Sequence, residues 1–110
     1  MELTVAGVSI ARTADGFLRN GAQWHEAVAQ ALAQLDNTEL TAQHWEILWF
    51  IRDYYQRYQH LPNSRMFVAA IRKQLGEAKG NSAYLHTLFP QGPLKFACKW
   101  AGLPKPPTCL

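Results

Sequence analysis

The sequence predicts a mainly α-helical domain with a small N-terminal β-hairpin and a short C-terminal arm. Three observations support this class. Alternating apolar residues occupy the first ten positions, apolar residues recur with helical spacing over about residues 23–101, and three prolines crowd the last seven positions. The 110 residues suffice for one domain, which we place at residues 1–102, with a flexible arm at residues 103–110.

The hairpin is predicted over about residues 2–18. A two-residue turn at residues 6–7 would bring the apolar positions of both strands to one face of the ladder. A second turn signal stands at Asp15-Gly16. The apolar positions are Leu3, Val5, Val8 and Ile10. We expect this face to pack on the helical core.

Helix boundaries are marked by caps and breakers. Thr41 is a good N-cap, and Gly76 and Gly102 are good stops for two later helices. The predicted helices cover residues 24–35, 42–58, 63–75, 81 or 82 to 88, and 93–101.

The helix over residues 42–58 is predicted to be central, because residues 47–51 leave it little polar face. Its core partners should lie on the next helix and on the hairpin. The side chains expected to be buried together are Trp45, Leu48, Trp49, Phe67 and Ile71. On this reading, Trp49→Ala should cost about 3–5 kcal/mol.

The composition limits the class of protein. Hydrophobic residues make up 48% of the chain and charged residues 17%, which favours a packed core. No apolar run approaches the ~20 residues of a membrane span, and the N-terminus lacks the features of a signal peptide. We therefore expect a cytoplasmic protein with reduced cysteines and no membrane partner. The net charge of +3 is too small to indicate nucleic-acid binding by itself.

One alternative function follows from the two middle helices. Helices 42–58 and 63–75, joined by a short turn, could form a helix-turn-helix. Arg65, Arg72 and Lys73 on the second helix would then face DNA phosphates or bases. A DNA-binding regulator therefore stays open, although the sequence has no dense basic stripe.

The chemistry of the chain is predicted to lie in its two cysteines, Cys98 and Cys109. Cys109 stands one residue from the C-terminus on a proline-stiffened arm, where a thiol can reach a partner. The alternative is an incidental cysteine in a disordered tail. The terminal carboxylate should raise the pKa of Cys109, and Lys99 and Lys105 can offset this if the arm lies back.

Cys98 has two open interpretations. It is either a small core residue or a resolving thiol that forms a disulfide with Cys109. The eleven residues from Cys98 to Cys109 span up to roughly 36–40 Å when the chain is fully extended. A turn at Gly102 would also let the arm fold back. No metal-ligand spacing, phosphate loop or nucleophile elbow accompanies the cysteines, so we expect no metal and no cofactor.

Several short stretches resemble one known family. They are His44-Trp45-Glu46, Arg52-Asp53, Lys79-Gly80-Asn81-Ser82 with Tyr84-Leu85, Leu88-Phe89-Pro90 with Gly92-Pro93, and residues 101–106 followed by Cys109. With them the chain resembles the DsrC/TusE family of small sulfur carriers, which includes the gamma component of dissimilatory sulfite reductase. The resemblance implies a hairpin, an orthogonal helical bundle with a helix-turn-helix-like element, and a persulfide on Cys109. It also implies that the chain acts in sulfur transfer as a protein cosubstrate of a partner enzyme and is not a catalyst by itself.

The family has two branches with different partners. The TusE-like branch takes sulfur from a TusBCD-like complex and relays it to a tRNA 2-thiouridylase with bound tRNA. The DsrC-like branch works with sirohaem sulfite reductase and uses both cysteines, the second of which matches Cys98. We favour the tRNA branch because it is the more widespread one, and the presence of Cys98 leaves the choice open.

Overall fold

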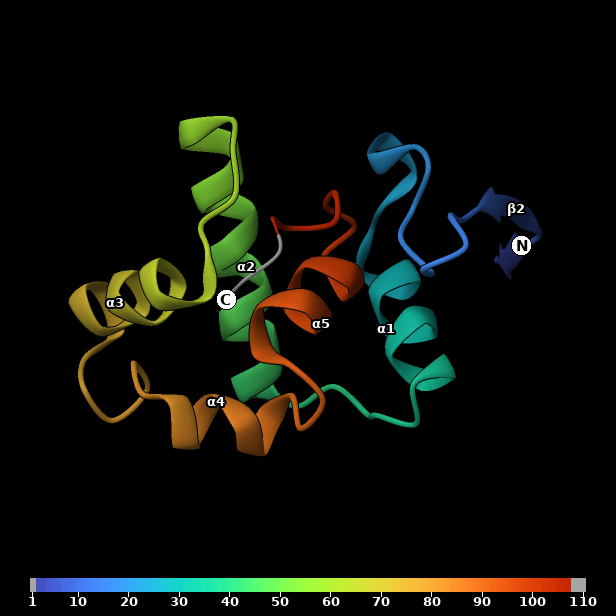
Figure 1. The fold of residues 1–110 in the computed structure, drawn as a ribbon. Helices are drawn as coiled ribbons and strands as arrows, with labels where there is room; N and C mark the ends of the chain where they lie inside the picture. The colour runs from blue at the N-terminus through green and yellow to red at the C-terminus, as the bar shows by residue number, and fades with distance from the viewer. Residues whose placement is uncertain (1, 108–110) are drawn as a thin grey trace.

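The computed structural model describes residues 2–107 and confirms the predicted fold class: a two-stranded antiparallel sheet followed by a bundle of helices (Figure 1). The strands are β1 (Glu2–Val5) and β2 (Val8–Ala11), and a 3-10 turn, η1 (Gly21–Gln23), follows them. The helices are α1 (Glu26–Leu35), α2 (Ala42–Tyr58), α3 (Ser64–Leu75), α4 (Ser82–Leu88) and α5 (Pro93–Trp100). None of the described helices has the length and apolar character that a membrane span requires.

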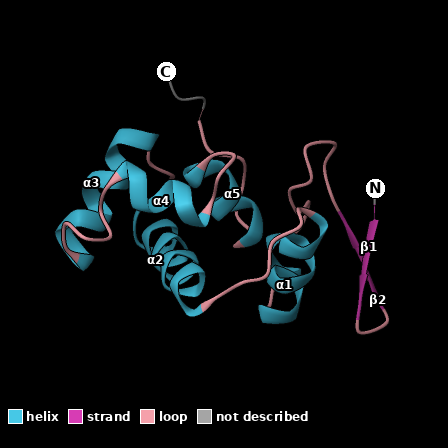
Figure 2. Ribbon diagram, turned by 90° about the horizontal axis from the view of Figure 1, so that it is seen from below, coloured by secondary structure: helices cyan, strands magenta, loops and turns pink. Residues whose placement is uncertain are grey.

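The hairpin has the predicted register but a different packing partner. Val5 pairs with Val8, and the turn residues Ala6 and Gly7 both have positive φ, 51° and 81°, as in a type I′ turn. The hairpin lies beside α1 and away from α2 (Figure 2). Ile10 is buried but Val8 is 54% exposed, so the prediction of one fully buried face is wrong. Val5, the partner of Val8 next to the turn, is buried, so at this end of the hairpin only one side chain of the pair reaches the core.

The central helix is α5, where the sequence indicated α2. This short helix packs against α1, α2, α3 and α4, and it lies in the middle of the bundle in Figure 1. Cys98 and Trp100 on α5 are at most 1% exposed. Leu48, Phe67 and Ile71 are buried as predicted.

Trp49 was predicted to be buried and is 44% exposed, while Trp45 is half-buried. The buried face of α2 consists of His44, Ile47, Leu48 and Ile51, which follow helical spacing. Trp45 and Trp49 lie on the neighbouring face, where Trp49 stacks on Trp45 at 6.0 Å between ring centroids. Hydropathy alone did not reveal which apolar stripe faces the core.

His44 explains why α2 begins where it does. Its Nδ1 accepts a hydrogen bond from the Thr41 backbone N–H at 3.1 Å, and the Thr41 hydroxyl accepts from the His44 N–H. This reciprocal cap confirms Thr41 as the N-cap. His44 Nε2 donates to the Leu88 carbonyl at 2.8 Å and ties α2 to the end of α4. Both ring nitrogens of this buried histidine therefore have hydrogen-bond partners, which is what a structural group requires.

Candidate functional site

The C-terminal arm begins from a helix end that is built into the body. Gly102 has a φ of 72°, its N–H donates to the Lys99 carbonyl at 3.3 Å, and the Leu103 N–H donates to the Cys98 carbonyl at 3.0 Å. These two bonds form a Schellman motif. Leu103, which was expected on the flexible arm, is only 7% exposed. The side chain of Leu103 therefore belongs to the hydrophobic core cluster.

Two side chains from distant segments hold the same helix end. Trp24 Nε1 donates to the Trp100 carbonyl at 2.8 Å, and Arg52 Nη1 donates to the Ala101 carbonyl at 2.8 Å. The Arg52 guanidinium also lies 3.8 Å from the centroid of the Trp24 ring. Burial lowers the pKa of Arg52, but an arginine stays charged at neutral pH. We call Trp24 and Arg52 the arm-root pair.

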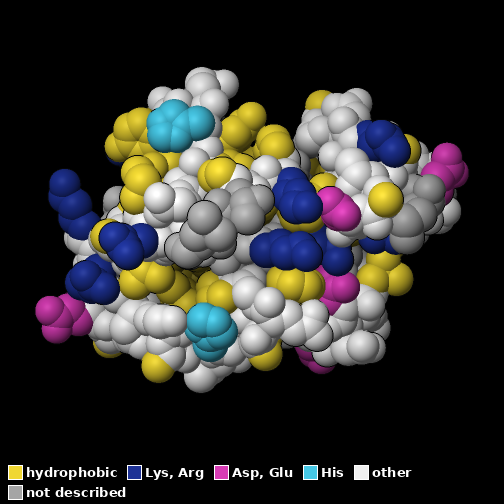
Figure 3. All heavy atoms as spheres, viewed as in Figure 1, with side chains coloured by type: hydrophobic (Ala, Val, Ile, Leu, Met, Phe, Trp, Pro, Cys, Tyr) yellow, Lys and Arg dark blue, Asp and Glu magenta, His cyan; other side chains and the backbone are white. Residues whose placement is uncertain are grey.

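The two lysines that could offset the terminal carboxylate if the arm lies back are each paired with an acidic side chain. Lys99 pairs with Asp36 at 3.0 Å and Lys105 pairs with Asp15 at 3.0 Å. The Lys105 hydrogen bond, reinforced by its charge, lowers the pKa of Asp15. Basic side chains gather over α5 and the arm, with acidic ones directly beside them (Figure 3). Lys99 and Lys105 are thus each paired with a carboxylate, and neither is a free cation that could activate a thiol.

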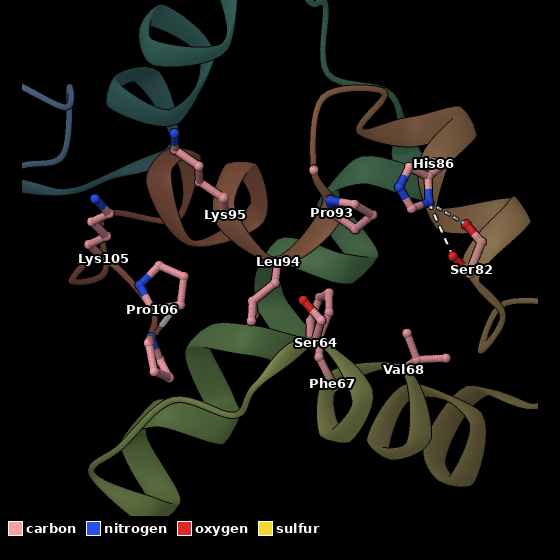
Figure 4. Close-up of a pocket in the computed structure, with 12 residues that line it drawn as sticks. Ser64, Phe67, Val68, Ser82, His86, Pro93, Leu94, Lys95, Lys105 and Pro106 are labelled. Atoms are coloured by element: carbon pink, nitrogen blue, oxygen red, sulfur yellow. Dashed lines mark hydrogen bonds between the residues drawn. The ribbon is translucent and has the colours of Figure 1, made fainter. Parts of the chain in front are cut away.

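The described end of the arm borders a groove of about 450 Å³ (Figure 4). Phe67 and Leu94 contribute apolar surface to it, Pro106 lies on one side, and Ser82 and His86 lie on the other. His86 Nδ1 donates to the Ser82 carbonyl at 2.8 Å. The candidate carrier Cys109 lies outside the described residues, two positions beyond Pro107.

Cys98 is placed inside the body. It is 0% exposed on the buried face of α5, and burial raises the pKa of its thiol far above the ordinary value. A thiol must be ionised and accessible to attack a sulfur atom, and Cys98 is neither in this conformation. A disulfide with Cys109 would therefore require that α5 or its C-terminal end first open.

The raised pKa of Cys98 predicts how stability changes in alkali. Below a pH of about 9, the ordinary pKa of the thiol, folded and unfolded chains both keep this proton. Above it the unfolded chain loses the proton and the folded chain keeps it, so the free energy of unfolding should fall by about 1.4 kcal/mol per pH unit. Urea unfolding between about pH 8 and pH 11 measures this slope. Cys98→Ala should lack that component, and identical slopes for both proteins would contradict a buried, protonated Cys98.

The family follows from a comparison with known proteins. A family model described as DsrC like protein matches residues 4–110. The chain belongs to the DsrC-like family. It is 50% identical over 108 residues to a Haemophilus influenzae protein named sulfurtransferase TusE homolog, covering 98% of this chain and 99% of that one. It is also 46% identical, with the same coverage, to sulfurtransferase TusE of Salmonella choleraesuis.

Solved structures of DsrC proteins share the fold of this DsrC-like chain. The solution structure of Allochromatium vinosum DsrC matches with a TM-score of 0.90 and 46% identity, over 100% of both chains. The oxidized gamma-subunit of dissimilatory sulfite reductase from Archaeoglobus fulgidus matches with a TM-score of 0.86 and 42% identity, also over 100% of both chains. The relatives by sequence and by structure thus carry the names of both branches of the family.

Proposed function

We propose that this DsrC-like chain carries sulfur as a persulfide on Cys109 and passes it to a partner enzyme. The observation that carries the proposal is the placement of the other thiol: the chain has two cysteines, and Cys98 is buried and protonated. Relatives named sulfurtransferase at 46–50% identity over nearly the whole chain support the same role. Cys109 is then the nucleophile, and Cys98 is a packing residue of α5.

The proposed reaction is a pair of sulfur exchanges without net oxidation. The Cys109 thiolate attacks the outer sulfur of a donor persulfide, a new S–S bond forms, and the donor leaves as a thiolate. An acceptor thiolate then attacks the outer sulfur on Cys109, which leaves as a thiolate in its turn. The thiolate is the reactive form of a cysteine, and in this proposal the partner's site sets the pKa of the reacting Cys109 thiol.

The acceptor that we propose is a tRNA 2-thiouridylase with bound tRNA, supplied through a TusBCD-like donor complex in the cytoplasm. The TusE names of the relatives and the buried Cys98 support this branch. Sirohaem sulfite reductase is the second candidate. It is favoured by the presence of Cys98 and by the similarity to a sulfite reductase gamma-subunit, and it requires Cys98 to leave the core.

Reconstituted tRNA thiolation tests the choice of branch. With donor complex, thiouridylase and tRNA, the Cys98→Ala variant should form 2-thiouridine at the rate of the unmodified chain, because a packing cysteine takes no part in the exchange. Nucleoside analysis of the tRNA gives the measurement. If Cys98→Ala stays folded but loses thiolation, Cys98 takes part in the chemistry and the sulfite reductase branch becomes the better assignment.

A further inference from the structure

We propose that Trp24 and Arg52 are positioning residues: they set the direction in which the C-terminal arm leaves the body and so restrict where Cys109 is presented. The inference rests on the proposed function only in its last step, the presentation of Cys109 to a partner. The geometry of the arm root stands independently of that function.

Trp24 and Arg52 supply hydrogen-bond donors to carbonyl groups at the C-terminal end of α5. Within α5 and its cap, the Cys98 and Lys99 carbonyls accept backbone N–H groups of Leu103 and Gly102. The last two carbonyls, of Trp100 and Ala101, accept from the arm-root pair instead. Buried carbonyl groups need such partners, and a cation at the negative end of a helix is favourable. The arm-root pair therefore fixes the residues from which the arm starts.

Contacts within the arm root leave little freedom for another geometry. A Cβ atom on Gly102 would lie 2.4 Å from a Trp24 side-chain atom, so the indole ring packs directly against the backbone at this position. The Arg52 guanidinium covers the same indole ring at 3.8 Å. Trp49 meets the Trp24 ring edge-on at 5.3 Å between centroids. These groups come from three separate parts of the chain, so the tertiary fold determines the start of the arm.

The direction set at the root is kept along the arm, because three prolines restrict the backbone conformations of the arm. Pro104, Pro106 and Pro107 have fixed φ, and between them Lys105 pairs with Asp15. Pro106 and Pro107 then line the groove beside Leu94. A chain extends at most ~3.6 Å per residue, so the place of Pro107 limits the volume in which the Cys109 thiol can be found.

A nitroxide on Cys109 tests the positioning directly, in a Cys98→Ala background so that one thiol is labelled. Paramagnetic broadening of backbone amide signals should concentrate around the groove. Arg52→Met should spread and weaken the broadening, and Arg52→Lys should restore part of it. Trp24→Phe, which removes the indole N–H donor together with part of the ring, should also spread and weaken it. Arg57→Met is the matched control, because Arg57 lies exposed on the same helix and pairs only with Asp53 among the described residues. A broadening pattern that is the same in all variants, or diffuse already in the background chain, overturns the proposal.

Sulfur transfer provides the functional readout. A partner that must order a freed arm pays conformational entropy on binding. The carrier concentration for half-maximal transfer should therefore rise about tenfold in Arg52→Met, with little change in the maximal rate. If the broadening has spread in Arg52→Met but the carrier concentration for half-maximal transfer is unchanged, the arm-root pair has no role in presenting Cys109 to the partner. If the unsubstituted chain transfers no sulfur, the proposed function fails, while the label still decides whether the arm-root pair sets the direction.

Discussion

Replacing Trp100 by alanine is expected to lower the free energy of unfolding by about 3–5 kcal/mol. Trp100 is 1% exposed and packs against Phe89 and Phe96, at centroid distances of 5.4 and 5.8 Å. Its Nε1 also donates to Asp36 Oδ2 at 2.8 Å, which joins α5 to the end of α1. Truncation would leave both a cavity and a partly buried carboxylate without one of its donors. The truncation would therefore loosen the packing of α5, the helix that leads into the arm.

Trp49→Ala is the matched comparison for Trp100→Ala. Trp49 is 44% exposed, and its edge-on contact with Trp24 and its stacking on Trp45 are each worth about 1 kcal/mol. The expected loss is therefore about 1–2 kcal/mol, below the 3–5 kcal/mol that its hydropathy suggested. Chemical denaturation of both variants measures the difference. Equal losses would mean that α2, and not α5, forms the centre of the core.

The elements of the fold were predictable because their signals are local. Thr41 caps α2 as expected, Asn63 and Asn81 cap α3 and α4 through their side chains, and Pro93 opens α5. Each cap depends on residues within one turn of the helix, so the sequence contains all the information needed.

The packing of the elements was harder to predict, because it depends on which of several apolar stripes finds a partner. The run over residues 47–51 is apolar nearly all round, and nothing in it indicates that Trp49 faces outward. Gly80 shows the same dependence on distant groups. A Cβ there would lie 2.2 Å from the Arg72 Cα atom, and that contact exists only after the loop folds onto α3.

The arm-root pair was missed for a related reason. The sequence placed Trp24 on a helix, whereas α1 begins at Glu26 and the indole ring reaches back to the end of α5. Arg52 did carry a usable signal: it is a cation within the apolar part of a helix, and a charge in such a place needs a partner. The partner itself, a backbone carbonyl 49 residues later, could not be read from the chain.

Cys109→Ala is expected to have the largest functional effect of any substitution, a complete loss of sulfur loading. The physical reason is the difference between the two thiols of the chain. Cys98 is fully buried and burial raises its pKa, so it cannot take over as nucleophile in the folded protein. Cys98→Ala is the matched control, since it removes a thiol of the same chemistry from the core and leaves the arm intact.

The intact mass of the folded protein after incubation with a persulfide donor tests the central claim most directly. The unmodified chain and Cys98→Ala should each gain one sulfur atom, and dithiothreitol should remove it. Cys109→Ala should gain none under the same conditions. A sulfur adduct that persists in Cys109→Ala, or its absence from the unmodified chain, would contradict the assignment of Cys109 as the sulfur-carrying residue.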